Sequence, residues 1–297
     1  MLVGQKSVRH VSLRRRLWFA MAVAALYGFV VHYIELQVLH EDFKVDSVQS
    51  VLGLVFGGLL VFRTNSAYAR WWEGRTLWGT LVNNSRNLIE KVCCLAQVPL
   101  VEREDVTRLL IGFAYALRNH LRRDGRLQDV PGFENDQANP THVPNYIVAL
   151  LYQRLGQWRR ENLIIDQELR IMDVNANALL DVCGGCERIA RTPMVVSYVH
   201  YLRVCIVLYL LALPWTMDAT LMMPMVTMLW AYFLCGMELI AEIIEEPFGR
   251  ERDDLPLDDI CSGIYAALLE ILSWSQVGER PASGQSGVGT ADAICVF

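Results

Sequence analysis

The residues best suited to chemistry in this sequence are two cysteines separated by two glycines. Cys183-Gly-Gly-Cys186 is a C-x-x-C motif, a spacing that can bind zinc or exchange thiols. A structural zinc ion needs four ligands, and neither a second C-x-x-C motif nor a close histidine pair accompanies this one in the sequence. We therefore expect the two thiols to pack within a helix. A membrane enzyme that uses them is kept as an alternative.

The histidines and the other cysteines follow no pattern of a catalytic or metal site. The six histidines are scattered, and none has a second histidine three or four residues away. The sequence contains no glycine-rich phosphate loop, nucleophile elbow or H-E-x-x-H motif. The remaining cysteines occur singly or as the adjacent pair Cys93-Cys94, which is typical of small apolar residues. We predict that the protein is not an enzyme and needs no metal or cofactor.

The composition indicates a protein that lies partly in a membrane and partly in water. The 297 residues are 53% hydrophobic and 20% charged, and the mean hydropathy is +0.26. This chain is too apolar for an average soluble domain and too charged to be buried entirely in lipid. The net charge of −5 provides no basic excess for a phosphate backbone, so we expect no nucleic-acid partner.

Four apolar runs without a charged residue predict four membrane-spanning helices. The runs are residues 17–34, 47–62, 204–217 and 219–237. A spanning helix needs about 20 mainly apolar residues, with about 17 as the lower limit, so the two middle runs must take in polar neighbours. These neighbours include Arg63 and Arg203, and such groups in a bilayer normally face protein or water. We expect shielded helices around a solvent path.

The distribution of arginine predicts the orientation of the chain. Arg14, Arg15 and Arg16 precede the first run, whereas the connections at 40–46 and 215–221 are mainly acidic. The positive-inside rule then places both termini and the long middle region in the cytoplasm of a cell whose inner membrane holds the protein. The thiols are expected to be reduced there.

The region after the second run is predicted to continue the same helix beyond the membrane. No proline occurs between Phe62 and Pro99, and a helix over 47–97 would extend roughly 75 Å, against about 30 Å of hydrocarbon. Residues 102–125 are amphipathic, 124–144 are typical of a loop, and helices follow over 145–160 and 164–190. The predicted parts are an arm with two spans (1–62), a cytosolic helical region (63–198), two further spans (199–245), a cytosolic segment (246–277) and a flexible tail (278–297).

Three segments resemble the bestrophin family, in particular its bacterial branch. They are FRTNSAYARWWEGRTLWGTLVNNSRN from Phe62, then Ala190-Arg-Thr-Pro193, and Glu246-Pro-Phe-Gly249 followed by Asp253-Asp-Leu-Pro256. The resemblance covers residues 10–275. It implies an all-α homopentameric ion channel, in which each subunit provides four membrane helices and a helical cytosolic portion around a central pore.

A stripe on the second span coincides with the pore neck that the resemblance implies. Leu54, Gly58 and Phe62 are four residues apart and share one helix face; periodicity alone is more typical of ordinary packing. The resemblance assigns these residues to the neck, where Gly58 replaces the usual bulky residue and should leave the middle wider or hydrated. Counting back from Pro193 places the second, cytosolic restriction at Ile165, for which a place in the core is the alternative.

The resemblance also raises the question of a calcium site. Eukaryotic members of the family close such a site with the acidic stretch after N-P-F-G. Here Ile243 replaces a neutral oxygen ligand and Arg252 adds a positive charge, and both changes weaken an all-oxygen cage. Glu251 and Asp254 are therefore at most the remnant of a calcium clasp, and we expect a solvated acidic loop held by arginines.

The sequence thus predicts a homopentameric channel in a lipid bilayer that passes small monovalent ions, with chloride as the family default. Apolar side chains at the neck would act as the gate. A sodium or potassium channel, as in some bacterial relatives, and a membrane-anchored scaffold or signalling protein remain the alternatives.

Overall fold

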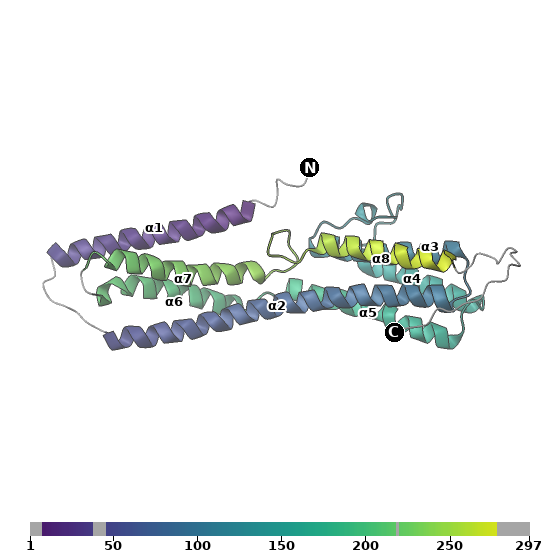
Figure 1. The fold of residues 1–297 in the computed structure, drawn as a ribbon, viewed down its shortest axis with the longest axis horizontal. Coiled ribbons are helices and arrows are strands. Elements are labelled where there is room, and N and C mark those ends of the chain that lie inside the picture. Colours follow the sequence, from purple (N-terminus) through teal and green to yellow (C-terminus); the bar gives the residue numbers. More distant parts are fainter. Residues whose placement is uncertain (1–7, 38–45, 218–219, 278–297) are drawn as a thin grey trace, which may run out of the picture.

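The computed structural model describes residues 8–37, 46–217 and 220–277, and these form an all-helical fold (Figure 1). The predicted flexible tail over 278–297 lies outside the described residues. The α-helices are α1 (Val8–Gln37), α2 (Asp46–Leu95), α3 (Leu100–Leu121), α4 (Val143–Arg160), α5 (Asp166–Arg191), α6 (Val196–Ala212), α7 (Met223–Ile244) and α8 (Leu257–Val277), with short 3-10 turns at Leu127–Asp129 (η1) and Pro214–Thr216 (η2). The all-α prediction is confirmed for these residues.

Helix α2 connects two halves of an elongated molecule (Figure 1). It has 50 residues, as the absence of proline before Pro99 predicted. Its first part lies with α1, α6 and α7, and we call these helices the apolar half. Its later part packs with α3, α5 and α8, while α4 packs against α3 and α5, and we call this group the bundle.

The apolar half contains the helices that are suited to a membrane. Three helical segments are long and apolar enough to cross one: Arg14–Gln37, Val51–Leu95 and Met223–Ile244. Helix α6 has only 17 residues, because the chain turns at Pro214, and it completes a fourth span only together with α5, from which it is bent by 41°. The number of spans is therefore three, or up to four, where the sequence predicted four.

The buried core is concentrated in the bundle. Its largest members, Trp78 and Trp158, have no exposed surface, and they belong to a cluster that runs through α2, α3, α4, α5 and α8. The buried cluster of the apolar half is much smaller and consists of Phe56, Leu60, Leu202, Ile206, Tyr209, Leu213 and Leu234. Burial thus holds the bundle together more than it holds the apolar half.

Candidate functional site: an exposed stripe on α2

The predicted neck residues lie on an exposed face of α2. Leu54 is 79% exposed and Phe62 is 69% exposed, and no neighbouring atom lies within 4 Å of the place that a Cβ on Gly58 would take. Phe56 and Leu60, on the opposite side of the same helix turns, are buried. Ordinary packing within one chain therefore does not explain this stripe.

The exposed face continues along α2 into the bundle and changes character there. Beyond Phe62 the exposed positions at helical spacing are Asn65, Ala69, Trp72, Thr76, Thr80, Asn83 and Asn87. The hydroxyls of Thr76 and Thr80 donate to backbone carbonyls of their own helix, at 2.9 and 3.1 Å, whereas the exposed asparagines add uncharged polar groups to this face. One helix thus presents an apolar stretch, which we call the neck stripe (Leu54, Gly58 and Phe62), followed by a mixed and uncharged stretch.

Ile165 lies near the other end of α2. It precedes the first turn of α5 and is 60% exposed, whereas the adjacent Ile164 is buried. The core alternative for Ile165 is therefore wrong, because Ile164 takes that place. The amide of Gln97 donates to the carbonyl of Leu163 at 3.0 Å, which puts this segment beside the end of α2, roughly 50 Å along the helix from Phe62.

A buried arginine sets the rotation of α2 directly beside the neck stripe. The side chain of Arg63 is 1% exposed, and its guanidinium lies 2.7 Å from a carboxylate oxygen of Glu245 and 3.4 Å from one of Glu238. The side chain therefore points into the protein, as expected for a charged residue at the edge of a membrane span. Arg63 is held inward, while the adjacent Phe62 is 69% exposed.

Arg63 belongs to a larger charge network on α7. Arg203 of α6 pairs with Glu238 at 2.8 Å and with Glu242 at 2.9 Å, and Arg16 of α1 lies 3.6 Å from Glu242. Glu238, Glu242 and Glu245 follow one another at helical spacing at the end of α7. This network was not predicted from the sequence, although three glutamates on one face after an apolar run are a signal that could have revealed it.

Comparison with known proteins now decides the family. The model for the bacterial and fungal bestrophin proteins matches residues 5–270. The chain belongs to this bestrophin family. It is 36% identical over 271 residues to a voltage-dependent anion channel-forming protein of Nostoc sp., covering 84% of this chain and 85% of the relative. It is 34% identical over 232 residues to the voltage-dependent anion channel-forming protein YneE of Salmonella typhi, covering 75% of each.

Solved structures agree with the assignment. A variant of a bacterial bestrophin homologue from Klebsiella pneumoniae superimposes with a TM-score of 0.80 at 26% identity, covering 87% of this chain and 99% of that one. A crystal structure described as a membrane protein superimposes with a TM-score of 0.81 at 25% identity, covering 86% and 98%. The resemblance predicted from the three sequence segments is confirmed, and the bestrophins are not an enzyme family.

The acidic loop of this bestrophin is closed by its own hydrogen bonds. Asp254 is only 9% exposed, and its carboxylate accepts the backbone N–H of Glu251 at 2.6 Å. The indole of Trp71 donates to the carbonyl of Asp253 at 3.1 Å. The expectation of a solvated loop is therefore wrong for Asp254. Because that carboxylate already accepts a hydrogen bond from a backbone amide and the side chain of Ile243 has no oxygen, these residues do not fit a calcium site with oxygen ligands alone.

The C-x-x-C thiols are structural in this bestrophin. Cys183 and Cys186 are both buried. Burial raises the pKa of the Cys183 thiol to about 12, and it also raises the pKa of Cys186. A thiol so far from its thiolate form is a poor nucleophile and a poor metal ligand. The prediction of packed thiols is confirmed.

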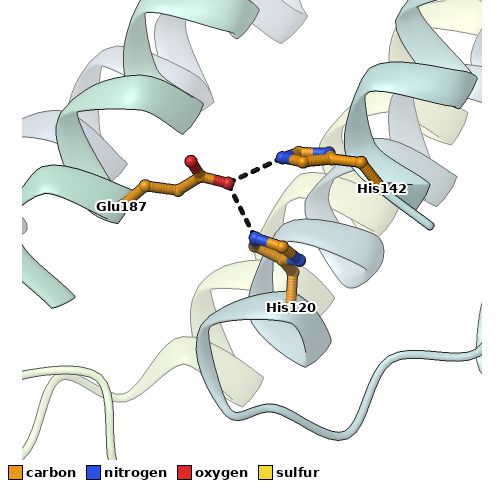
Figure 2. A group of neighbouring side chains, drawn as sticks. All are labelled: His120, His142 and Glu187. Carbon is orange, nitrogen blue, oxygen red and sulfur yellow. Dashed lines mark hydrogen bonds and ion pairs between the residues drawn. The ribbon is translucent and has the colours of Figure 1, made fainter. Parts of the chain in front are cut away.

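A second polar cluster in the bundle was not indicated by the sequence. His120, His142 and Glu187 come from α3, the start of α4 and α5, and they meet at hydrogen-bond distance (Figure 2). Residues so far apart in the chain carry no local signal, and the prediction of no metal-ligating group did not anticipate them.

Proposed function

We propose that this protein is a bestrophin-type channel that assembles as a homopentamer and conducts small anions, with chloride as the principal ion, across the inner membrane. The observation that carries the proposal is the neck stripe, an apolar face that is exposed in the single chain and continues directly into a more polar face on the same helix. The relatives are voltage-dependent anion channel-forming proteins, which supports an anion rather than a cation.

Five copies around an axis would turn the neck stripe into stacked apolar rings. Phe62 and Leu54 offer a passing ion no replacement for its hydration shell, so a narrow neck loses its water and stops conduction, whereas a modest widening admits both. Gly58 adds no side chain between these rings, so the middle of the neck is wide. Ile165 forms the second restriction at the cytosolic exit.

The charge network beside the neck stripe does not favour anions or cations. The three glutamates of α7 are matched by Arg16, Arg63 and Arg203, so the network adds no net charge to the path. The positions that follow the neck stripe on the same face, as far as Asn87, carry no acidic side chain. Cation channels typically line their pores with rings of Asp or Glu. The uncharged face therefore gives no support to the cation alternative, and the case for an anion depends on the relatives.

The conduction path is tested with purified protein in planar bilayers. In a KCl gradient, the sign of the reversal potential distinguishes an anion channel from a cation channel. The variant Leu54→Ala/Phe62→Ala should raise the open probability of the channel several-fold, because smaller apolar rings hydrate more readily. Phe19→Ala on α1 is the matched control, since Phe19 is 71% exposed but belongs to another helix, and it should leave the current unchanged.

The assembly is tested separately by light scattering of the purified protein, where five copies per particle are expected. A cation-selective reversal potential would reject the anion assignment, and unchanged current in the double variant would reject the gate. Absence of ion flux under every condition would favour the membrane-anchored scaffold.

A further inference from the structure

Three side chains with metal-ligating atoms converge in the bundle (Figure 2). The Nε2 atoms of His120 and His142 lie 2.7 and 2.6 Å from the same carboxylate oxygen of Glu187. The imidazole centroids are 4.5 Å apart, with 35° between the ring planes. A ligand atom from each of the three residues lies within 4.8 Å of the others, so a single ion can reach all three.

We propose that His120, His142 and Glu187 form a binding site for a divalent transition-metal ion, with zinc as the best match. Two imidazole nitrogens and one carboxylate are a zinc ligand set, whereas calcium and magnesium prefer oxygen alone. The three side chains are 25%, 28% and 18% exposed, which leaves a solvent-accessible fourth position for water. The buried C-x-x-C thiols are not part of this site.

The separations require only a small adjustment for an ion to enter. With zinc–ligand bonds of about 2.0–2.1 Å in a tetrahedral arrangement, ligand atoms stand about 3.3 Å apart. The two nitrogen–oxygen separations here are 2.7 and 2.6 Å, so Glu187 must draw back by less than about 1 Å, and the two imidazole nitrogens, which lie within 4.8 Å of one another, must come to a similar spacing. Its side chain has the rotatable bonds to do so while α5 stays in place.

The protons must also be rearranged. The Nδ1 atom of His142 accepts the backbone N–H of Asn145 at 3.2 Å, so its proton lies on Nε2 and is donated to Glu187. A metal ion at Nε2 moves that proton to Nδ1 and gives up the hydrogen bond that caps α4. Metal binding and this cap therefore compete, and acidic pH, which protonates imidazoles, must weaken the metal.

The charges around the cluster act in both directions. Burial alone would raise the pKa of Glu187, but hydrogen bonds from His142 and His120 hold that pKa below its usual value, so the carboxylate is ready as a ligand at neutral pH. Arg191 lies 3.4 Å from the other carboxylate oxygen of Glu187 and opposes a cation. Its side chain is 68% exposed and is free to turn toward solvent.

Metal binding would tie three helices together at one end of the bundle. Glu187 is close to the end of α5 at Arg191, after which the chain enters α6 in the apolar half. His120 is close to the end of α3, and His142 caps the start of α4. An ion held by all three links the last turn of α3 and the start of α4 to the last turns of α5, which should stabilise the bundle independently of ion conduction.

The test uses the full-length, tag-free protein in detergent after chelation and removal of the chelator. Titration with zinc chloride by calorimetry should show one ion per chain, and zinc should raise the midpoint of thermal unfolding. His120→Gln, His142→Gln and Glu187→Gln should each weaken zinc binding at least tenfold and abolish the thermal shift, because each removes one of three ligands. His200→Ala, an exposed histidine outside the cluster, and Cys183→Ser/Cys186→Ser should bind zinc as the parent protein does.

Two measurements keep the proposal falsifiable if a variant folds poorly. Far-ultraviolet circular dichroism checks the fold of each variant, and cobalt substitution in the parent protein should give the visible spectrum of a tetrahedral nitrogen and oxygen site without thiolate bands. Absence of zinc binding to the parent protein would overturn the proposal, as would unchanged binding in the folded Glu187→Gln variant. Thiolate bands in the cobalt spectrum would overturn it by placing the metal at the cysteines.

Discussion

The two parts of α2 show how one helix can be held by different forces. In the bundle, Trp78, Leu81 and Leu88 of α2 have no exposed surface and pack in the main core. In the apolar half, Leu54 and Phe62 are open, and the helix is fastened beside Phe62 by the buried ion pairs of Arg63. Burial of apolar surface therefore stabilises the bundle, whereas charge pairing fixes the direction in which the neck stripe faces.

The ion pairs of the two regions differ in the same way. Arg63 and its partners are almost wholly buried, whereas the pair between Arg188 and Glu73 in the bundle is exposed, at 69% and 44%. A buried charge that loses its partner is costly, while an exposed pair contributes little. Four experiments challenge this contrast, in order of decreasing effect.

Removing the buried arginine should have the largest effect. Arg63→Ala leaves Glu238 and Glu245 without their closest buried cation and should lower the free energy of unfolding by about 3–5 kcal/mol. Arg188→Ala, the matched exposed control, should lower it by no more than about 1 kcal/mol. Denaturant unfolding in detergent, followed by circular dichroism, measures both. Equal losses for the two variants would show that the contrast between the halves is wrong.

The same substitution on the two parts of α2 should separate stability from conduction. Leu81→Ala removes a fully buried side chain and should lower the free energy of unfolding by about 2–5 kcal/mol. Leu54→Ala removes an exposed one and should change it by less than about 0.5 kcal/mol, while raising the current. A large destabilisation by Leu54→Ala would mean that the neck stripe is packed within its own chain.

Acid should weaken the bundle through Asp258. Burial alone would raise the pKa of Asp258, but Arg122 and Arg118 hold it below its usual value. The carboxylate therefore contributes stability above its unfolded pKa of about 3.9, and this contribution is lost as the pH falls through the lower folded pKa. Because the side chain is 62% exposed, Asp258→Asn should cost no more than about 1 kcal/mol at neutral pH.

The measurement is thermal unfolding from pH 7 down to pH 2. The variant should lose less stability than the parent protein below about pH 4. Identical pH profiles would show that the contacts of Asp258 with α3 do not contribute.

The rate of thiol labelling should distinguish exposed cysteines from buried ones, without any substitution in the protein. Cys94 is exposed, whereas Cys183 and Cys186 are buried, and burial raises the pKa of Cys183 to about 12. At pH 7.5 a maleimide should therefore label Cys94 at least tenfold faster than either buried thiol, because only the thiolate reacts. Peptide mass spectrometry after timed quenching measures the rates. Fast labelling of Cys183 would reveal local opening of the bundle.

Much of the helical architecture could be predicted because it follows from local patterns. The run without proline before Pro99 was enough to predict α2, and the prolines and glycines between 124 and 144 predicted the loop before α4. The third span was less predictable, because a run of apolar residues does not show where the bend at Pro214 shortens the helix. The shared face of Leu54, Gly58 and Phe62 followed from spacing, and its assignment to a neck followed from the family resemblance. Its exposure could be known only once the neighbours of α2 were known.

The sequence by itself determined the helical class of this protein, the length of α2 and the family, since all three depend on residue types at short spacing. Only the tertiary structure decided the partners of Arg63, which pairs with a glutamate 182 residues away, and the meeting of His120 with Glu187 across 67 residues. Helical periodicity depends on residues that are close together in the sequence. Such pairings form only when separate helices pack, and no local sequence pattern predicts which helices will be in contact.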